Sequence, residues 1–292
     1  MIIVELLGGL GNQMFQYAAG RAVALRAGLE LKLDATGYAK QSLRAYRLNV
    51  FNIVEQFADD AEIYHRKPRR RFSTNWLRYQ FERTFVPFHR RTVIVERTLA
   101  FDPAVLRIRR SAYLAGFWQS DRYFADYADR IRADFTFKEP PSASNRQLLE
   151  SIAAGNAVSL HVRRGDYVAD PTVNRYHGVL SPDYYRAAVA HILESVPKPH
   201  FYVFSDDIPW VKQALPLPVP VTYVEHNGPT ADYEDLRLMS RCNHHIIANS
   251  SFSWWGAWLA QAPGQIVIAP RHWFSGIRID ATGRVPDGWL LF

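Results

Sequence analysis

The chain has 292 residues, of which 48% are hydrophobic and 22% charged, and its formal net charge is +7. This balance is typical of a water-soluble globular protein, and the length accommodates one large or two ordinary domains. No apolar run approaches the ~20 residues needed to cross a bilayer, and the N-terminus lacks the features of a signal peptide. The single cysteine, Cys242, excludes an internal disulfide and a cysteine-based zinc site. These features favour a reducing, cytoplasmic location.

The N-terminal segment predicts a β–loop–α–β unit. Residues 2–7 are an apolar run of strand length, and a glycine-rich turn follows at 8–12. Residues 13–27 place apolar side chains at three- and four-residue spacing, which predicts a helix that ends at Gly28. Residues 29–33 predict a second strand. The region from 36 to 135 is rich in aromatic residues and has no regular pattern, so we expect it to be irregular.

Residues 65–91 form a strongly basic segment, with nine Lys and Arg against a single acid, Glu82. Aromatic side chains are interspersed at positions 72, 76, 79, 81, 85 and 88. Basic residues mixed with aromatics can bind nucleic acid or an anionic membrane surface. A solvated insertion without any ligand explains the same composition, and both interpretations stay open.

The second half alternates predicted strands and helices, which is typical of a largely parallel sheet. Residues 139–144 have the composition of a linker, which divides the chain into domains 1–141 and 142–292. Helices are expected to start near 181, 209, 232 and 251. Strands are expected at 157–162, 201–204, 219–224, 244–248 and 266–269.

The strand at 157–162 runs directly into Arg163, Arg164, Gly165 and Asp166. Ligands of open α/β sheets bind at the carboxyl ends of strands, and a planar guanidinium forms paired, charge-assisted bonds to phosphate oxygens. The arginine pair therefore predicts a diphosphate site. Outside such a context, two adjacent arginines are more often a solvated surface pair, and His161 is consistent with a core histidine.

Two further loops follow predicted strands. Asp206 and Asp207, after Ser205, offer acceptors for a guanine edge or for ribose hydroxyls. The second loop precedes a helix whose backbone N–H groups form a natural anion site, and it contains Asn249, Ser250, Ser251 and Ser253. Each loop alone is a weak signal, because serine before a helix is usually a cap and Asp-Asp is usually a turn. Together with the arginines they predict a nucleoside-diphosphate site.

The N-terminal Gly9 and Gly11 are similar to a dinucleotide-binding fingerprint, with Asp34 near the expected ribose position. Met14 replaces the third glycine, so a nicotinamide-dependent oxidoreductase is the weaker alternative. We expect the glycines to let the backbone approach a ligand closely. Asn12 and Gln13 would then hydrogen-bond a sugar.

Metal-binding signatures are missing from the sequence. It contains no Asp-x-Asp, no His-Glu-x-x-His and no P-loop. A site that stabilises a diphosphate without a metal needs arginine, which agrees with the pair at 163 and 164.

These residues lie in motifs that resemble those of the bacterial α-1,2-fucosyltransferases of glycosyltransferase family 11. Residues 161–168 also resemble the His-x-Arg-Arg-x-Asp motif of α-1,6- and protein O-fucosyltransferases. The matching motifs extend along the whole chain and leave mainly 36–110 unmatched; they lie at 8–17, 161–168, 204–207 and 239–258.

The resemblance implies a GT-B-like α/β fold, with two Rossmann-type domains facing a cleft. The N-terminal domain would serve the acceptor and the C-terminal domain the donor, GDP-fucose. It further implies inversion at the anomeric carbon and no metal or other cofactor.

The resemblance also implies a role for each motif. Arg163 and Arg164 would bind the diphosphate beside His161 and offset the charge of the leaving group. The resemblance names no base, because family members do not share an obvious one; the acceptor hydroxyl must lose a proton, and Asp166, the carboxylate nearest the arginines, is the candidate for that base or only orients the arginines. Ser250 and Ser251 would assist at the phosphates, within the donor loop that also contains Asn249 and Ser253. Asp206 or Asp207, after Ser205, would hold the guanosine, and Asn12 would face the fucose or the acceptor.

The expected acceptor is a terminal β-galactoside on a lipid-linked or lipopolysaccharide oligosaccharide, modified at its 2-hydroxyl during O-antigen biosynthesis. The basic segment 65–91 would then rest on the anionic cytoplasmic face of the inner membrane. Under this interpretation nucleic acid is not a partner. Nucleic-acid binding through 65–91 stays an alternative function, beside the oxidoreductase.

Overall fold

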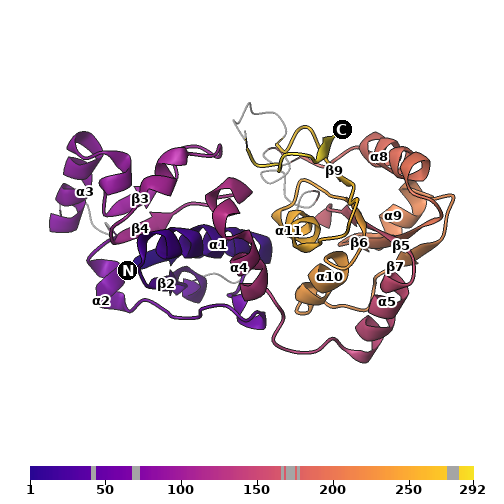
Figure 1. Cartoon of the computed structure of the whole chain (residues 1–292), viewed down its shortest axis with the longest axis horizontal. Helices are drawn as coiled ribbons and strands as arrows, with labels where there is room; N and C mark the ends of the chain where they lie inside the picture. Colours follow the sequence, from indigo (N-terminus) through magenta and orange to yellow (C-terminus); the bar gives the residue numbers. More distant parts are fainter. Residues whose placement is uncertain (41–43, 68–72, 166–167, 169–174, 176–177, 275–282) are drawn as a thin grey trace. The chain divides into compact units, whose positions relative to one another are not determined.

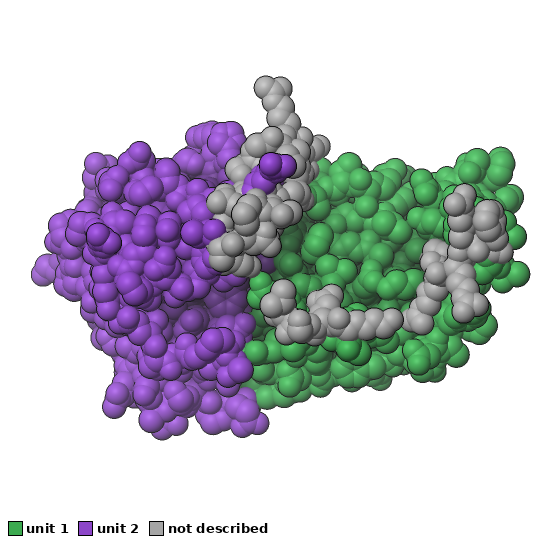
Figure 2. Space-filling view, turned by 180° about the vertical axis from the view of Figure 1, so that it is seen from behind, with its two compact units in different colours: residues 1–138, 280–286 green, residues 139–279, 287–292 purple. Residues whose placement is uncertain are grey.

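The computed structural model describes residues 1–40, 44–67, 73–165, 168, 175, 178–274 and 283–292. The chain forms two compact units, which Figure 2 shows in separate colours. Unit 1 comprises Met1–Lys138 and Asp280–Pro286, and unit 2 comprises Glu139–Ile279 and Asp287–Phe292. The division after Lys138 lies close to the boundary predicted at 141. The assignment of 280–286 to unit 1 was not predicted.

Unit 1 is built on a four-stranded parallel sheet in the order β2-β1-β4-β3. Figure 1 labels β2, β3 and β4 of this sheet. Its central strand β1 pairs along Ile2–Glu5 with β2 and along Ile2–Val4 with β4. The strands are β1 (Ile2–Glu5), β2 (Leu31–Asp34), β3 (Val93–Val95) and β4 (Ala112–Ala115).

Helix α1 (Leu10–Ala27) is almost completely buried in unit 1. It begins three residues before the predicted start at Gln13, so that Gly11 and Asn12 lie in its first turn. At Gly20 the helix lies so close to β1 that an added Cβ would be 3.0 Å from the Cβ of Val4. The helix ends at Gly28 as predicted, in the left-handed region with φ 66° that glycine adopts without strain.

The expectation that residues 36–135 are irregular is wrong, because β3, β4 and several short helices lie there. These strands have three and four residues, no fewer than several strands that were predicted, but they lie in a segment rich in basic and aromatic residues that shows no regular alternation of strands with helices. The helices are α2 (Asp60–Tyr64), α3 (Thr74–Phe85) and α4 (Ala128–Asp134). Single 3₁₀ turns lie at Thr36–Lys40, Leu48–Val50, Phe88–Arg90, Pro103–Arg107, Asp121–Tyr123 and Ala125–Tyr127.

Unit 2 is built on a six-stranded parallel sheet in the order β10-β9-β8-β5-β6-β7. Figure 1 labels β5, β6, β7 and β9 of this sheet. All five predicted strands are confirmed, and the two-residue β10 was missed. The strands are β5 (Asn156–Val162), β6 (Pro199–Ser205), β7 (Val221–Tyr223), β8 (His244–Ile246), β9 (Val267–Ala269) and β10 (Leu290–Leu291).

Helices cover both faces of this sheet. Alternate residues of a strand point to opposite faces, so Val158 packs with α8 and α9 whereas Ala157 packs with α5 and α10. This layering confirms the predicted α/β class. The helices are α5 (Ala143–Ala153), α8 (Pro182–Ser195), α9 (Ile208–Ala214), α10 (Asp232–Met239) and α11 (Ser251–Leu259).

The predicted helix starts in unit 2 are confirmed, and α8, α9 and α11 each begin with a side-chain cap. The Ser181 hydroxyl accepts a hydrogen bond from the backbone N–H of Tyr184 at 3.4 Å, ahead of Pro182. Three acids occupy the first turn of α10, where the helix dipole favours negative charge. In the part of the chain that the structure describes, no helix has both the length and the hydropathy needed to cross a membrane.

Asp134 joins α4 to α1 within unit 1. Its buried carboxylate accepts hydrogen bonds from the Tyr17 hydroxyl at 2.8 Å and from Arg21 Nε at 3.0 Å. Removing one partner from a buried charge pair leaves the other uncompensated. We therefore expect Asp134→Ala to lower the free energy of unfolding by about 3–5 kcal/mol in urea denaturation.

Asp183→Ala is the matched control, because Asp183 is 86% exposed and pairs at 2.8 Å with Arg186, which is itself 60% exposed. An exposed pair of this kind contributes less than about 1 kcal/mol. Equal losses in the two variants would contradict a special role for Asp134.

Candidate functional site

Three loops of unit 2 leave neighbouring strands at the same edge of the sheet. In the strand order, β5 lies between β8 and β6. Parallel strands have their carboxyl ends at one edge, so the loops that start at Arg163, Asp206 and Asn249 lie side by side. The ring of His161 at the end of β5 also lies 5.9 Å from that of Phe252, in the first turn of α11.

The two arginines are held by the two aspartates across this edge. Arg163 Nη1 lies 2.8 Å from Asp206 Oδ2, and Arg164 Nε donates to Asp207 Oδ2 at 3.1 Å. The backbone N–H of Arg164 donates to Asp206 Oδ1 at 2.8 Å. The parallel register aligns Val162 at the end of β5 with Ser205 at the end of β6. The residues that follow the two strands continue this alignment, so that Arg163 faces Asp206 and Arg164 faces Asp207. Asp206 and Asp207 therefore orient the guanidiniums, and their assignment to the guanosine stays a prediction.

Arg164 is further fixed by Trp210 of α9. Its guanidinium carbon lies 3.8 Å from the centre of a Trp210 ring, a cation–π contact. Asp207 supports the same helix, because its Oδ1 accepts the backbone N–H of Trp210 at 3.2 Å. The Ser205 hydroxyl in turn accepts the N–H of Asp207 at 2.9 Å. Ser205 is thus a support for the loop, and Trp210 is a contact that the motif analysis missed.

Gly165 leaves room for the carboxylate of Asp206. A Cβ at this position would lie 2.6 Å from Asp206 Oδ2. The carboxylate cannot move aside without weakening its bonds to Arg163 and to the Arg164 N–H. The close approach explains why a glycine follows the arginines.

His161 is buried at the end of β5, with 5% exposure. Burial lowers the pKa of His161 to about 4; the charge of Arg163 acts in the same direction, and Asp206 opposes it. The ring is therefore neutral at physiological pH. Its Nδ1 is buried and has no hydrogen-bond partner among the described residues.

The loop before α11 contains the predicted serines in two different settings. Ser250 caps the helix, since its hydroxyl accepts the N–H of Phe252 at 3.3 Å, and Ser251 begins it. Ser253 is buried, and its hydroxyl donates to the Ser250 carbonyl at 3.4 Å. Asn249 is also buried and donates to the carbonyls of Gly178 and Trp273 at 3.2 and 3.3 Å. Asn249 and Ser253 thus shape the loop from inside.

Asp166, the predicted base or arginine-orienting residue, lies outside the described residues. Among the residues that are described, no group of three or more His, Cys, Asp or Glu side chains is arranged to hold a metal ion. Metal independence stays a prediction.

In unit 1 the glycine turn connects β1 to α1. Gly8 has a positive φ of 80°, and Gly9 is the residue that precedes α1. Gln13 is fully buried: its Nε2 donates to the carbonyls of Gly8 and Ala45, and its Oε1 accepts the N–H of Arg47. These bonds give Gln13 a structural part in holding residues 45–47 beside the turn, and its binding of a sugar stays a prediction.

Asn12 is held from the loop after β4. Gln119 Nε2 donates to Asn12 Oδ1 at 2.7 Å, and Gln119 Oε1 accepts from Arg284 Nη1. Glu96 shapes this loop, because its carboxylate accepts the N–H groups of Phe117 and Trp118 at 2.7 and 2.9 Å. Burial raises the pKa of Glu96, against these bonds and the charge of Arg284. The sequence did not point to Gln119, Arg284 or Glu96, since only the fold brings them to the glycine turn.

Asp34 is engaged within unit 1. It is 1% exposed and accepts hydrogen bonds from the Tyr113 hydroxyl at 2.6 Å and the Thr36 N–H at 3.0 Å. Burial by itself would raise the pKa of Asp34, but the hydrogen bonds from Thr36 and Tyr113 and the nearby Lys67 lower it. Both carboxylate oxygens are thus occupied. The oxidoreductase alternative loses the acid that would bind a ribose.

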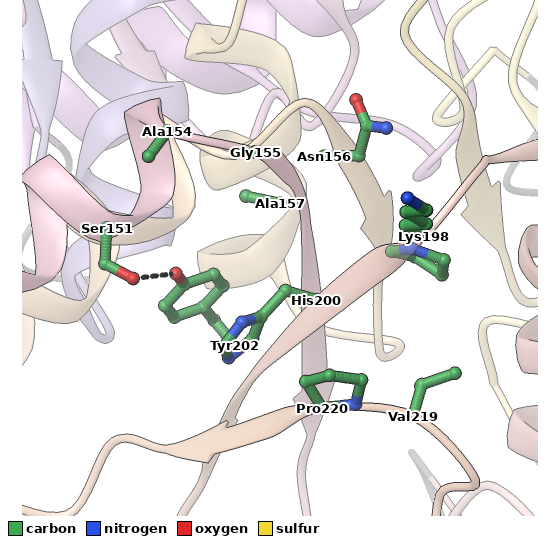
Figure 3. Close-up of a pocket in the computed structure, with 11 residues that line it drawn as sticks. Ser151, Ala154, Gly155, Asn156, Ala157, Lys198, His200, Tyr202, Val219 and Pro220 are labelled. Atoms are coloured by element: carbon green, nitrogen blue, oxygen red, sulfur yellow. Dashed lines mark hydrogen bonds between the residues drawn. The ribbon is translucent and has the colours of Figure 1, made fainter.

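A cavity of about 540 Å³ lies at the other edge of the unit 2 sheet, by the amino ends of β5 and β6 (Figure 3). Its lining includes Asn156, Lys198 and His200, and beside them the hydroxyls of Ser151 and Tyr202 lie 2.7 Å apart. The loops with the arginines leave the carboxyl ends of the same strands. The cavity is therefore separate from the candidate site.

The neutral His161 predicts a loss of stability in acid. An unfolded chain binds a proton on this histidine near pH 6.5, whereas the folded protein does so only near pH 4. The contribution of neutral His161 to the free energy of unfolding is therefore complete above about pH 6.5, and it decreases as the pH is lowered toward 4. We expect His161→Gln to reduce the loss of unfolding free energy between about pH 7 and pH 5 by about 2 kcal/mol.

Urea denaturation at the two pH values measures this difference. Burial also lowers the pKa of His245, to about 3, so the variant should keep part of the pH dependence. An unchanged pH dependence in His161→Gln would show that His161 does not resist protonation.

Comparison with known proteins gives relatives along the whole chain. The profile of glycosyl transferase family 11 matches residues 1–280. An alpha-1,2-colitosyltransferase of Escherichia coli is 34% identical, over 99% of this chain and 98% of the relative. The O-antigen biosynthesis glycosyltransferase WbnK of Escherichia coli is 32% identical, over 93% of this chain and 94% of the relative. Human galactoside alpha-(1,2)-fucosyltransferase 1 is 28% identical over 50% of this chain and 42% of the relative.

Solved structures share the fold. Fucosyltransferase NodZ from Bradyrhizobium superimposes with a TM-score of 0.53 at 15% identity, covering 89% of this chain and 92% of NodZ. Arabidopsis thaliana FUT1 in complex with GDP gives a TM-score of 0.53 at 11% identity, covering 91% and 69%. These similarities confirm the GT-B-like α/β class. Since the family profile covers nearly the whole chain and full-length relatives exceed 30% identity, the protein belongs to glycosyl transferase family 11.

Proposed function

We propose that the protein transfers L-fucose from GDP-β-L-fucose to the 2-hydroxyl of a terminal galactoside on a bacterial surface glycan precursor. Transfer would invert the anomeric carbon and need no metal. Membership of family 11 supports glycosyl transfer. A structure of the NodZ α-1,6-fucosyltransferase soaked with GDP-fucose supports the donor, and the similarity to WbnK supports a glycan acceptor.

The observation that carries the proposal is the pair of arginines at the carboxyl end of β5, each oriented by an aspartate. Arg163 pairs with Asp206 at 2.8 Å and Arg164 pairs with Asp207 at 3.1 Å. The guanidinium of Arg164 also lies over a ring of Trp210. Five N–H donors allow one guanidinium to bond an aspartate and a phosphate at the same time. The pair is thus preorganised for the diphosphate of GDP.

The reaction would be a single displacement through an oxocarbenium-like transition state. Negative charge builds on the departing GDP while its bond to the sugar breaks. Cations that are already in place stabilise this charge without reorganising, which usually supplies the largest single contribution. Arg163 and Arg164 would thus act on the leaving group as well as on binding.

The start of α11 supports the same anion. Ser250 and Ser251 lie at the first turn, where backbone N–H groups and the helix dipole favour negative charge. The neutral His161 lies beneath this turn, against Phe252. We assign the two serines to the phosphates, with Asn249 and Ser253 shaping their loop.

In this proposal, unit 1 binds the acceptor. Asn12, fixed by Gln119, would contact the fucose or the acceptor near Gly9 and Gly11. The acceptor hydroxyl must lose a proton, which suggests a carboxylate base. Asp166 is the proposed residue, either as that base or as a group that orients the arginines.

A second donor follows from the similarity to an alpha-1,2-colitosyltransferase. Colitose is L-fucose without its 3-hydroxyl, so one diphosphate site suits both GDP-sugars. GDP-colitose is therefore the second candidate donor.

The proposed reaction predicts release of GDP in the presence of EDTA. The purified chain is incubated with GDP-fucose or GDP-colitose and a panel of β-galactosides, and GDP is measured by chromatography. We expect release with GDP-fucose and a product whose linkage, determined by NMR, is to the 2-hydroxyl. No release with either donor over the panel would contradict the function, and activity that EDTA abolishes would contradict metal independence.

Arg164→Ala should reduce kcat by about 10²–10³-fold, because a preorganised donor to the departing charge is lost. Arg186→Ala is the matched control, since Arg186 on α8 is 60% exposed and pairs with Asp183 at 2.8 Å. Circular dichroism checks that both variants are folded. A nearly parental kcat in folded Arg164→Ala would remove Arg164 from the mechanism.

A further inference from the structure

Helix α3 exposes a stripe of large apolar side chains. Leu77, Phe81 and Phe85 are 54%, 59% and 71% exposed. Their four-residue spacing places them along one face of the helix, and the rings of Phe81 and Phe85 lie 5.1 Å apart. A contiguous apolar surface of this kind marks an interaction site more often than isolated exposed residues do.

The opposite side of α3 is the one that packs on unit 1. Tyr79 packs against the cluster that contains Ile63 and Val93. Glu82 is buried, and its carboxylate accepts the N–H of Thr92 at 2.7 Å. The apolar stripe therefore adds nothing to the core of unit 1.

A basic cavity of about 560 Å³ lies next to the stripe. Arg78, adjacent to Leu77 on α3, contributes to it together with residues of other segments. The lining residues are His65, Arg66, Arg78, Thr92, Arg110 and Ser111. The Thr92 hydroxyl is engaged, because it donates to the Glu82 carboxylate at 2.8 Å. The three guanidiniums and the Ser111 hydroxyl suit a phosphate group, which accepts several hydrogen bonds and carries negative charge.

Backbone carbonyls, and not carboxylates, hold Arg66 and Arg78. Arg66 Nη1 donates to the Glu62 carbonyl at 3.1 Å, and Arg78 donates to the His65 carbonyl. Within the described parts of the chain, no carboxylate pairs with Arg66, Arg78 or Arg110. Unlike Arg163 and Arg164, these arginines thus have no direct carboxylate partner among the described residues; the carboxylate of Glu82 reaches the cavity only through Thr92.

We propose that α3 and this cavity form a docking surface for an anionic lipid bilayer. Leu77, Phe81 and Phe85 enter the interface between head groups and acyl chains, and the cavity takes a lipid phosphate. An apolar helix face combined with neighbouring cations is the arrangement of interfacial helices. The aliphatic Leu77 in the stripe favours a bilayer over nucleic acid, because stacking on bases requires aromatic rings.

The two contributions support each other, because one weak membrane signal gives only marginal binding. Such a surface would hold the enzyme at the leaflet that carries a lipid-linked acceptor, and this part of the inference rests on the proposed function. Binding to lipid itself does not depend on it.

Sedimentation of the full chain with vesicles tests the surface. One set contains phosphatidylcholine alone, and the other contains equal parts of phosphatidylcholine and phosphatidylglycerol. We expect binding to the anionic vesicles that weakens as salt is raised, and little binding to the neutral ones. Equal binding to both sets would overturn the proposal, as would absence of binding to either.

Two double variants separate the contributions. Phe81→Ser with Phe85→Ser should weaken binding at least about tenfold, through lost apolar insertion. Arg78→Gln with Arg110→Gln should weaken it about tenfold or more, at roughly fivefold for each cation near an anionic surface. Phe57→Ser, at a 49% exposed site of unit 1 outside α3, and Arg186→Gln in unit 2 are the matched controls. Parental binding by either double variant would overturn the proposal.

An activity assay with a soluble acceptor and a binding assay with an oligonucleotide distinguish membrane docking from a loss of fold and from binding of nucleic acid. With a soluble galactoside acceptor, both double variants should keep the parental rate, so that lost vesicle binding is not a loss of fold or catalysis. If the parental chain is inactive in that assay, the proposed function fails while the vesicle result still decides the docking surface. Salt-dependent binding of a single-stranded oligonucleotide, without vesicle binding, would overturn the proposal in favour of nucleic acid.

Discussion

The candidate site of unit 2 depends on two ion pairs that join the ends of β5 and β6. Adjacent guanidiniums repel each other, and long side chains at a strand end have many conformations. Asp206 and Asp207 limit both effects, because each carboxylate holds one arginine at about the distance of a charge-assisted hydrogen bond. The register of the sheet creates the pairing, since it continues the alignment of Val162 with Ser205. The close contact at Gly165 follows from the same geometry.

The sequence was informative where a local pattern determines structure. The apolar strand before Arg163, the cap at Ser181 and the stop at Gly28 are each encoded within a few residues, and all were predicted. The partnership of arginines and aspartates was not predicted, although all four residues were assigned to the donor. It depends on how two strands about 40 residues apart are aligned in the sheet, which neither strand encodes by itself. β3 and β4 were missed although they are no shorter than the predicted β7 and β1, because the basic and aromatic residues around them show no regular alternation of strands with helices.

Arginine serves two different purposes in this chain, and its partners distinguish them. At the candidate site of unit 2, an aspartate faces the guanidinium of Arg163 and another faces that of Arg164. Each ion pair fixes the direction of the guanidinium and leaves a small local net charge. Beside α3 the anchors are neutral carbonyls, so that position is retained together with a positive potential. The first arrangement suits a ligand that is bound at defined atoms. The second suits an extended anionic surface, whose attraction depends on total charge.

The assignment of 280–286 to unit 1 has a consequence for biosynthesis. Gly283 accepts a hydrogen bond from the Ser120 hydroxyl, and Arg284 bonds Gln119, the residue that holds Asn12. A nascent chain emerges from the ribosome starting at its N-terminus, and N-terminal domains commonly fold first. Here unit 1 lacks these contacts until the segment with Gly283 and Arg284 has been translated. The loop beside Asn12 therefore reaches its final form only after the strands and helices from β5 to α11 in unit 2 have been synthesised.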